Sequence, residues 1–109
     1  MADQEQILEK GKFAVVVDDE LRDLIPGYFE NRRQDIVLIL SALEQGDFEL
    51  IRTIGHKMKG SGGGYGFDRI TEIGRNIEAA AKDSKRQEIL DQTNNLQDYL
   101  DCVQVVFQS

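Results

Sequence analysis

The chain has 109 residues and a formal net charge of −7, which results from 20 acidic and 13 basic side chains. This length fits a single domain, and so acidic a chain is a poor non-specific ligand for the phosphate backbone of nucleic acids. The sequence contains no apolar run of about 18 residues and no secretory leader pattern, so we expect no membrane span and a cytoplasmic location. The single cysteine, Cys102, excludes an internal disulfide and agrees with that location.

The N-terminal segment has an ambiguous pattern. Residues 1–12 are mostly polar, and the apolar run of residues 13–17 fits either a buried strand or a connecting segment. The only proline, Pro26, argues against a chain of strands joined by turns. We therefore treat residues 1–17 as a short N-terminal segment and residues 18–109 as the helical bundle of a single domain.

Helical spacing of apolar residues begins after Asp18 and Asp19, either of which can cap a helix. The spacing continues to Glu44. Pro26 and Gly27 are expected to kink or split this element near its first turns.

Three further helices follow. Gly46 ends the first helix, Asp47 can cap the second and Asp68 can cap the third, which ends at residues 82–84. The apolar positions that define the second, third and fourth helices are Phe48, Ile51, Ile54 and Met58, then Ile70, Ile73 and Ile77, then Ile89, Thr93, Leu96, Leu100, Val103 and Phe107. Short connections imply antiparallel neighbours, so the expected fold class is all-α, an antiparallel up-down four-helix bundle with a short N-terminal extra segment.

The only histidine, His56, precedes a run of glycines on the second expected helix. A helix turns about 100° per residue, which puts His56 about 150° from the centre of the apolar face and therefore toward solvent. Arg52 and Lys59 lie four residues before and three residues after it, on the same side, and Gly60 and Gly63 lie one and two turns beyond.

This surface is chemically suited to carry a phosphoryl group. An exposed imidazole is partly neutral near pH 7 and can attack phosphorus, and cations at Arg52, Lys57 and Lys59 can stabilise the oxygens placed on the ring. The glycines leave room for a partner at the ring, although they also fit a helix that ends in a flexible loop.

A short motif resembles a known family, the histidine-containing phosphotransfer (HPt) domain. Its parts are His56, Lys59, Gly60 and the small residue after it, followed by Gly66 before the next helix. The best match covers residues 47–82. The longer glycine run and the Pro26-Gly27 pair depart from the family pattern.

The resemblance implies a four-helix bundle in which the Nε2 atom of His56 is the phosphoacceptor. It implies that Lys59 neutralises the phosphoryl group, that Gly60 keeps the approach open and that Glu78 could hold the other ring nitrogen. A glutamate would favour the imidazolium more than a neutral amide would. The implied partner is the receiver domain of a response regulator or a hybrid histidine kinase.

The same resemblance implies a covalent phosphohistidine carrier and not an enzyme with its own catalytic site. No cofactor is expected, and the Mg²⁺ needed for transfer is expected on the receiver domain. No carboxylate cluster surrounds His56, and one His and one Cys far apart supply no metal site. We expect a monomer.

Other interpretations explain less of the sequence. The run before Asp18 and Asp19 looks like the start of a receiver domain, but the required later strands are missing. The outer glycines Gly55 and Gly60 match a P-loop, but Ser61 stands where the phosphate-binding lysine belongs. The remaining alternative is a non-phosphorylated helical protein–protein interaction module, which does not require Lys59 beside His56.

Overall fold

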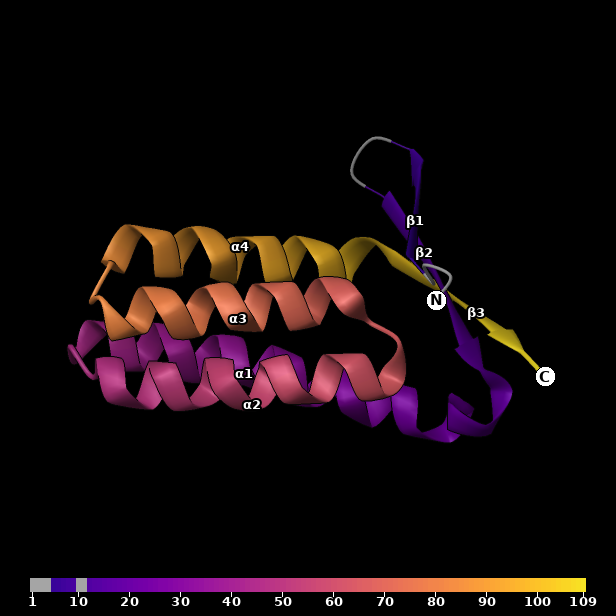
Figure 1. Cartoon of the computed structure of the whole chain (residues 1–109), viewed down its shortest axis with the longest axis horizontal. Coiled ribbons are helices and arrows are strands. Elements are labelled where there is room, and N and C mark those ends of the chain that lie inside the picture. The colour runs from indigo at the N-terminus through magenta and orange to yellow at the C-terminus, as the bar shows by residue number, and fades with distance from the viewer. Residues whose placement is uncertain (1–4, 10–11) are drawn as a thin grey trace.

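The computed structural model describes residues 5–9 and 12–109. Within this part of the chain the fold is mostly helical, as expected, with four α-helices that lie side by side and are joined by short connections at alternating ends (Figure 1). The helices are α1 (Ile25–Glu44), α2 (Phe48–Tyr65), α3 (Asp68–Lys82) and α4 (Arg86–Cys102). None of the helices that the structure describes is both long and apolar enough to span a bilayer.

A three-stranded sheet lies at the end of the helices and was not expected from the sequence (Figure 1). Its strands are β1 (Glu5–Glu9), β2 (Lys12–Asp18) and β3 (Val103–Gln108), in the order β1-β2-β3. The β1–β2 pair is antiparallel and the β2–β3 pair is parallel. The chain is therefore not purely α-helical, and the strand alternative for residues 13–17 is the one that occurs.

The last helix ends earlier than predicted. The sequence assigned Val103 and Phe107 to it, but α4 stops at Cys102 and both residues belong to β3. They are spaced three and seven residues after Leu100, so they also fit a helical stripe. The tertiary pairing with β2 decides between the two periods, because it places Val103 opposite Phe13 and Phe107 opposite Val17.

The helix starts follow local capping chemistry. Asp18 caps a short 3₁₀ helix, η1 (Asp19–Leu24), by accepting from the Glu20 backbone N–H at 2.9 Å. Pro26 then lies in the first turn of α1, so the predicted split occurs where proline costs no helical hydrogen bond.

The later caps are mixed. Asp47 caps α2 as predicted, with the Leu50 N–H 3.1 Å from its carboxylate. Asp68 was predicted to cap α3 but is the first residue inside that helix, and the cap position is Phe67. An acidic side chain in the first turn still interacts favourably with the helix dipole.

Helices α2 and α3 approach each other closely because glycines face each other in their contact. A Cβ built on Gly55 would lie 2.7 Å from the backbone nitrogen of Glu78, and one on Gly74 would lie 2.5 Å from the backbone nitrogen of Lys59. Gly62 faces α3 in the same way, with Thr71 as its neighbour. This contact leaves no room for larger side chains, and it brings the backbones of the two helices together beside His56.

The glycine run does not end α2 in a loop. The helix continues to Tyr65, and Gly66 then adopts a left-handed conformation with φ of 86°. The backbone N–H of Phe67 returns to the carbonyl of Gly62 at 2.9 Å, which closes the helix end. Gly62 and Gly66 thus have structural roles, whereas the exposed Gly63 and Gly64 have no close packing partner.

Candidate functional site

His56 lies on the outer face of α2, as the helical spacing predicted. Its side chain is 66% exposed, and its Nδ1 atom is 2.9 Å from Oε2 of Glu78 on α3. Lys59, one turn further along α2, places its ammonium nitrogen 2.8 Å from the other oxygen of the same carboxylate. The structure thus brings together three residues that the sequence analysis had singled out, with Glu78 at the centre.

The carboxylate of Glu78 is held in its ionised form. The hydrogen bond from Lys59 is the main cause that lowers the pKa of Glu78, and the contact with His56 lowers it further against the opposing effect of partial burial. An ionised carboxylate only accepts hydrogen bonds, so the proton in the contact must sit on Nδ1 of His56. In the neutral ring, Nε2 then carries the free lone pair.

The close contact of α2 and α3 explains why Glu78 reaches the ring. Gly55 directly precedes His56, and its missing side chain lets the backbone of Glu78 lie against α2. Gly74, one turn earlier on α3, makes the reciprocal contact at Lys59. Two glycines therefore set the distance between the carboxylate and both of its partners.

A shallow hollow surrounds His56. The lining residues are Glu49, Arg52, Thr53, His56, Lys57 and Glu78. The two predicted cations, Arg52 and Lys57, therefore lie around the ring. Sequence reasoning missed Glu49 and Thr53, although they are seven and three residues before His56 and the same helical spacing would have identified them.

Beyond the ring, the surface of α2 is bare. Gly60 is exposed, and a Cβ built there would meet no atom within 4 Å. Gly63 is also exposed and would meet only the Thr71 hydroxyl, at 3.9 Å. Neither glycine is required by packing within the domain, in contrast to Gly55 and Gly62, and each lowers the intrinsic stability of the helix by about 1 kcal/mol relative to alanine.

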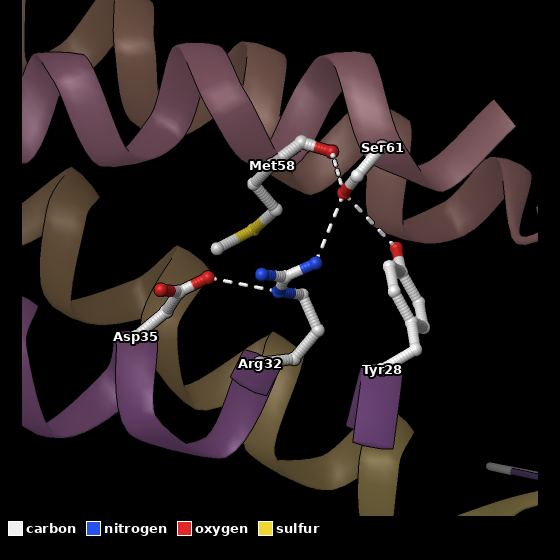
Figure 2. A network of polar contacts seen from close by, with 5 residues as sticks. All are labelled: Tyr28, Arg32, Asp35, Met58 and Ser61. Carbon is white, nitrogen blue, oxygen red and sulfur yellow. Dashed lines mark hydrogen bonds and ion pairs between the residues drawn. The ribbon is translucent and has the colours of Figure 1, made fainter. Parts of the chain in front are cut away.

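A second polar network, which the sequence analysis did not identify, joins α1 to α2 (Figure 2). Ser61 accepts from Arg32 at 3.0 Å, lies 3.3 Å from the Tyr28 hydroxyl and donates to the backbone carbonyl of Met58 at 3.1 Å. Arg32 also pairs with Asp35 at 2.8 Å and lies over the Tyr28 ring at 4.8 Å. This network fixes the glycine-rich part of α2 to α1.

The ion pair in this network is largely shielded from water, with side-chain exposures of 14% for Arg32 and 18% for Asp35. Burial raises the pKa of Asp35, and the Arg32 guanidinium and, more weakly, Lys57 oppose that change. Burial likewise raises the pKa of the Tyr28 phenol, against hydrogen bonds from Ser61 and Arg32. Lys57 therefore lines the hollow around His56 and also lowers the pKa of Asp35 in this network.

No group of three or more His, Cys, Asp or Glu side chains in residues 5–9 and 12–109 could hold a metal ion. The chain has no match among curated proteins, and none among solved structures. The family model described as the Hpt domain matches residues 17–106, which is most of the chain and includes every residue of the site around His56. The chain therefore belongs to the Hpt domain family, whose members carry out histidine phosphotransfer in phosphorelay signalling.

Proposed function

We propose that this chain is a phosphorelay intermediate that carries a phosphoryl group on Nε2 of His56 and exchanges it with an aspartate of a receiver domain. The observation that carries the proposal is the Glu78 contact. It engages Nδ1 of an exposed ring and leaves Nε2 as the nucleophilic nitrogen. The Hpt family match supports the same chemistry.

The transfer step follows from this arrangement. The Nε2 lone pair attacks the phosphorus of a phosphoaspartyl group, a P–N bond forms, and the P–O bond to the aspartate breaks as its carboxylate leaves. The ring becomes a phospho-imidazolium whose positive charge lies against the Glu78 carboxylate. Attack in the reverse direction by a receiver aspartate restores the neutral ring, so one site serves both directions of flow.

Lys59 has two anions within its reach during this cycle. In the free protein its ammonium group pairs with Glu78. When a phosphoryl group arrives on His56, three residues before it on the same face, Lys59 can move to the phosphoryl oxygens while Glu78 keeps its contact with the ring. The lysine thus offsets negative charge when it develops, and Glu78 holds the lysine nearby at other times.

The receiver would dock on the face that contains His56. Gly60 and Gly63 let a partner approach the ring closely. Leu38 on α1 and Leu50 on α2 are both exposed. Leu38 lies one turn after Asp35, Leu50 lies two turns before Lys57, and Asp35 and Lys57 attract each other across the α1–α2 contact. The two leucines can therefore supply an apolar border to the docking face. Val37, the exposed residue next to Leu38, points further from α2 by helical spacing.

In this proposal the chain acts as one up-down bundle domain that carries the group covalently and does not catalyse a reaction of its own. The receiver domain supplies the Mg²⁺ and the aspartate, and it belongs to a response regulator or a hybrid histidine kinase. Cytoplasmic signalling fits these partners.

Incubation with receiver domains phosphorylated on aspartate tests the proposal. We expect a label on this chain that is labile in acid and stable in alkali, and we expect no label on His56→Gln. A broad panel of phosphorylated receivers that all fail to label the folded wild-type chain would contradict the carrier role and favour a non-phosphorylated interaction module.

The clearance at Gly60 has a matched control. Gly60→Leu should slow transfer by at least about tenfold because its side chain would occupy the approach to the ring, while the domain stays folded because that space is open. Gly27→Leu, at an equally open position in the first turn of α1, should transfer normally. Equal transfer by both variants would exclude a role for Gly60 in access.

A further inference from the structure

The two edges of the three-stranded sheet are built differently. The β1 edge has Glu5 and Glu9 in a five-residue strand, and its pairing with β2 is irregular between Ile7 and Glu9. Charges and irregularities of this kind discourage further strand pairing. The β3 edge has neither feature, since its sequence is VQVVFQ and it pairs with β2 in unbroken register over all six residues.

The outer face of β3 is uncharged and consists of Gln104, Val106 and Gln108. Val106 is 52% exposed, and on the same face the neighbouring strand β2 presents Val16, its register partner. The inner face is already used, because Val105 and Phe107 pack against the core and the Arg22 guanidinium lies 4.2 Å from the centre of the Phe107 ring. In this sheet β3 has a hydrogen-bonded neighbour, β2, on one side only, so its other edge is available to a further strand.

Two of the three strands, β1 and β2, lie largely outside the residues that the family model matches, whereas most of β3 lies inside them. The Hpt match begins at residue 17, so β1 and most of β2 precede it. The sheet is an addition to the helices, and it builds an uncharged strand edge on a chain whose net charge is −7. Residues 102–109 contain no acidic or basic side chain.

From these observations we propose that the β3 edge pairs with the β3 edge of a second copy of this chain, in antiparallel orientation, to form a continuous six-stranded sheet across a two-fold axis. Two copies of so acidic a chain repel each other over most of their surface, and β3 is the strand at which they can meet without opposing like charges. The charged β1 edges would then lie at the two outer ends, where they end the sheet.

The symmetry restricts the register. Residues opposite each other in an antiparallel pair point to the same face, so the axis must pass between identical residues. Either Val105 or Val106 therefore lies opposite its own counterpart. In both registers the outer-face position 106 is opposite residue 104 or 106 of the other copy, which makes these two positions sensitive to added charge.

Sedimentation analysis over a concentration series tests the proposal. We expect the 12.3 kDa chain to approach twice that mass at high concentration. With Val106 opposite itself, Val106→Lys places two lysines opposite each other, and with Val105 opposite itself, Gln104→Lys places a lysine opposite Val106. In either register at least one of the two variants should therefore weaken the association at least about tenfold. Both positions are exposed, so the helical circular dichroism signal should not change.

Val37→Lys is the control, since Val37 is at least as exposed but lies on α1, away from the sheet. Hydrogen exchange of the β3 amides should slow as the wild-type concentration rises. A monomer at every concentration up to about 1 mM would overturn the proposal. It would also be overturned by a dimer that both lysine variants in β3 retain, or by one that Val37→Lys alone disrupts.

Discussion

At the scale of single residues, the chemistry of the site depends on one carboxylate with two partners. Glu78 accepts from Nδ1 of His56 through one oxygen and from the ammonium group of Lys59 through the other. The first contact fixes the tautomer of the ring, and the second holds a cation where phosphoryl charge would develop. The two contacts can be tested separately because different substitutions remove them.

Lys59→Ala should slow phosphoryl transfer by about tenfold to a hundredfold, the range expected for one charge-assisted hydrogen bond in a partly exposed site. The variant should remain folded, because Lys59 contacts Glu78 at the surface and no core residue depends on it. Rapid-quench transfer kinetics would measure the effect. An unchanged rate in the folded variant would remove Lys59 from the mechanism.

Substitution of Glu78 tests the positioning of the ring. Glu78→Ala should lower the transfer rate by about tenfold, because nothing then holds the proton on Nδ1 of His56. Glu78→Gln should restore most of the rate, because an amide oxygen can accept from the same N–H. If the glutamine variant were as slow as the alanine variant, the negative charge of Glu78 and not its orientation of the ring would be the important property.

At the scale of elements, glycines in α2 and α3 divide into two classes with opposite expected effects on stability. Gly74→Ala should lower the free energy of unfolding by about 1–3 kcal/mol, because its Cβ would lie 2.5 Å from the Lys59 backbone nitrogen. Gly64→Ala should raise it by up to about 1 kcal/mol, because that position is open and alanine favours the helix. Chemical denaturation would measure both, and equal effects would contradict the close contact between α2 and α3.

The α1–α2 network predicts a dependence of stability on pH. An acid whose pKa is raised by folding binds a proton more readily in the folded state, so its contribution to stability falls as pH rises from its ordinary pKa through the raised one. The wild type should therefore lose stability relative to Asp35→Asn as pH rises through this range from about 4. Chemical denaturation across pH measures this, and the opposite slope would show that Arg32 outweighs burial at Asp35.

At the scale of the whole molecule, the sequence predicts the helices and the exposed face of His56 because both depend on local spacing. The buried set Ile51, Ile54 and Met58 fixes the orientation of α2, and the structure agrees. The sheet could not be predicted in this way. Val103 fits a helical stripe and a strand equally well, and only its pairing with Phe13, 90 residues earlier in the chain, selects the strand.

The sequence likewise predicted part of the site, namely the residues of the motif, but not how closely the helices that carry them approach each other. The motif gave His56 and Lys59, and the distance between α2 and α3 was hidden because Gly55 and Gly74 look like ordinary helix-weakening residues in a single sequence. Once they are seen in contact, the reach of Glu78 to the ring follows. The buried pair of Arg32 and Asp35 had no sequence signal beyond its three-residue spacing.

The most direct test of the account asks which atom of this chain receives the phosphoryl group. The chain, labelled with ¹⁵N in its histidine, would be phosphorylated by a phosphorylated receiver domain and observed by NMR at alkaline pH. Because Glu78 holds the proton on Nδ1, we expect the phosphoryl group on Nε2 of His56. A phosphoryl group on Nδ1, or on a residue other than His56, would contradict the account.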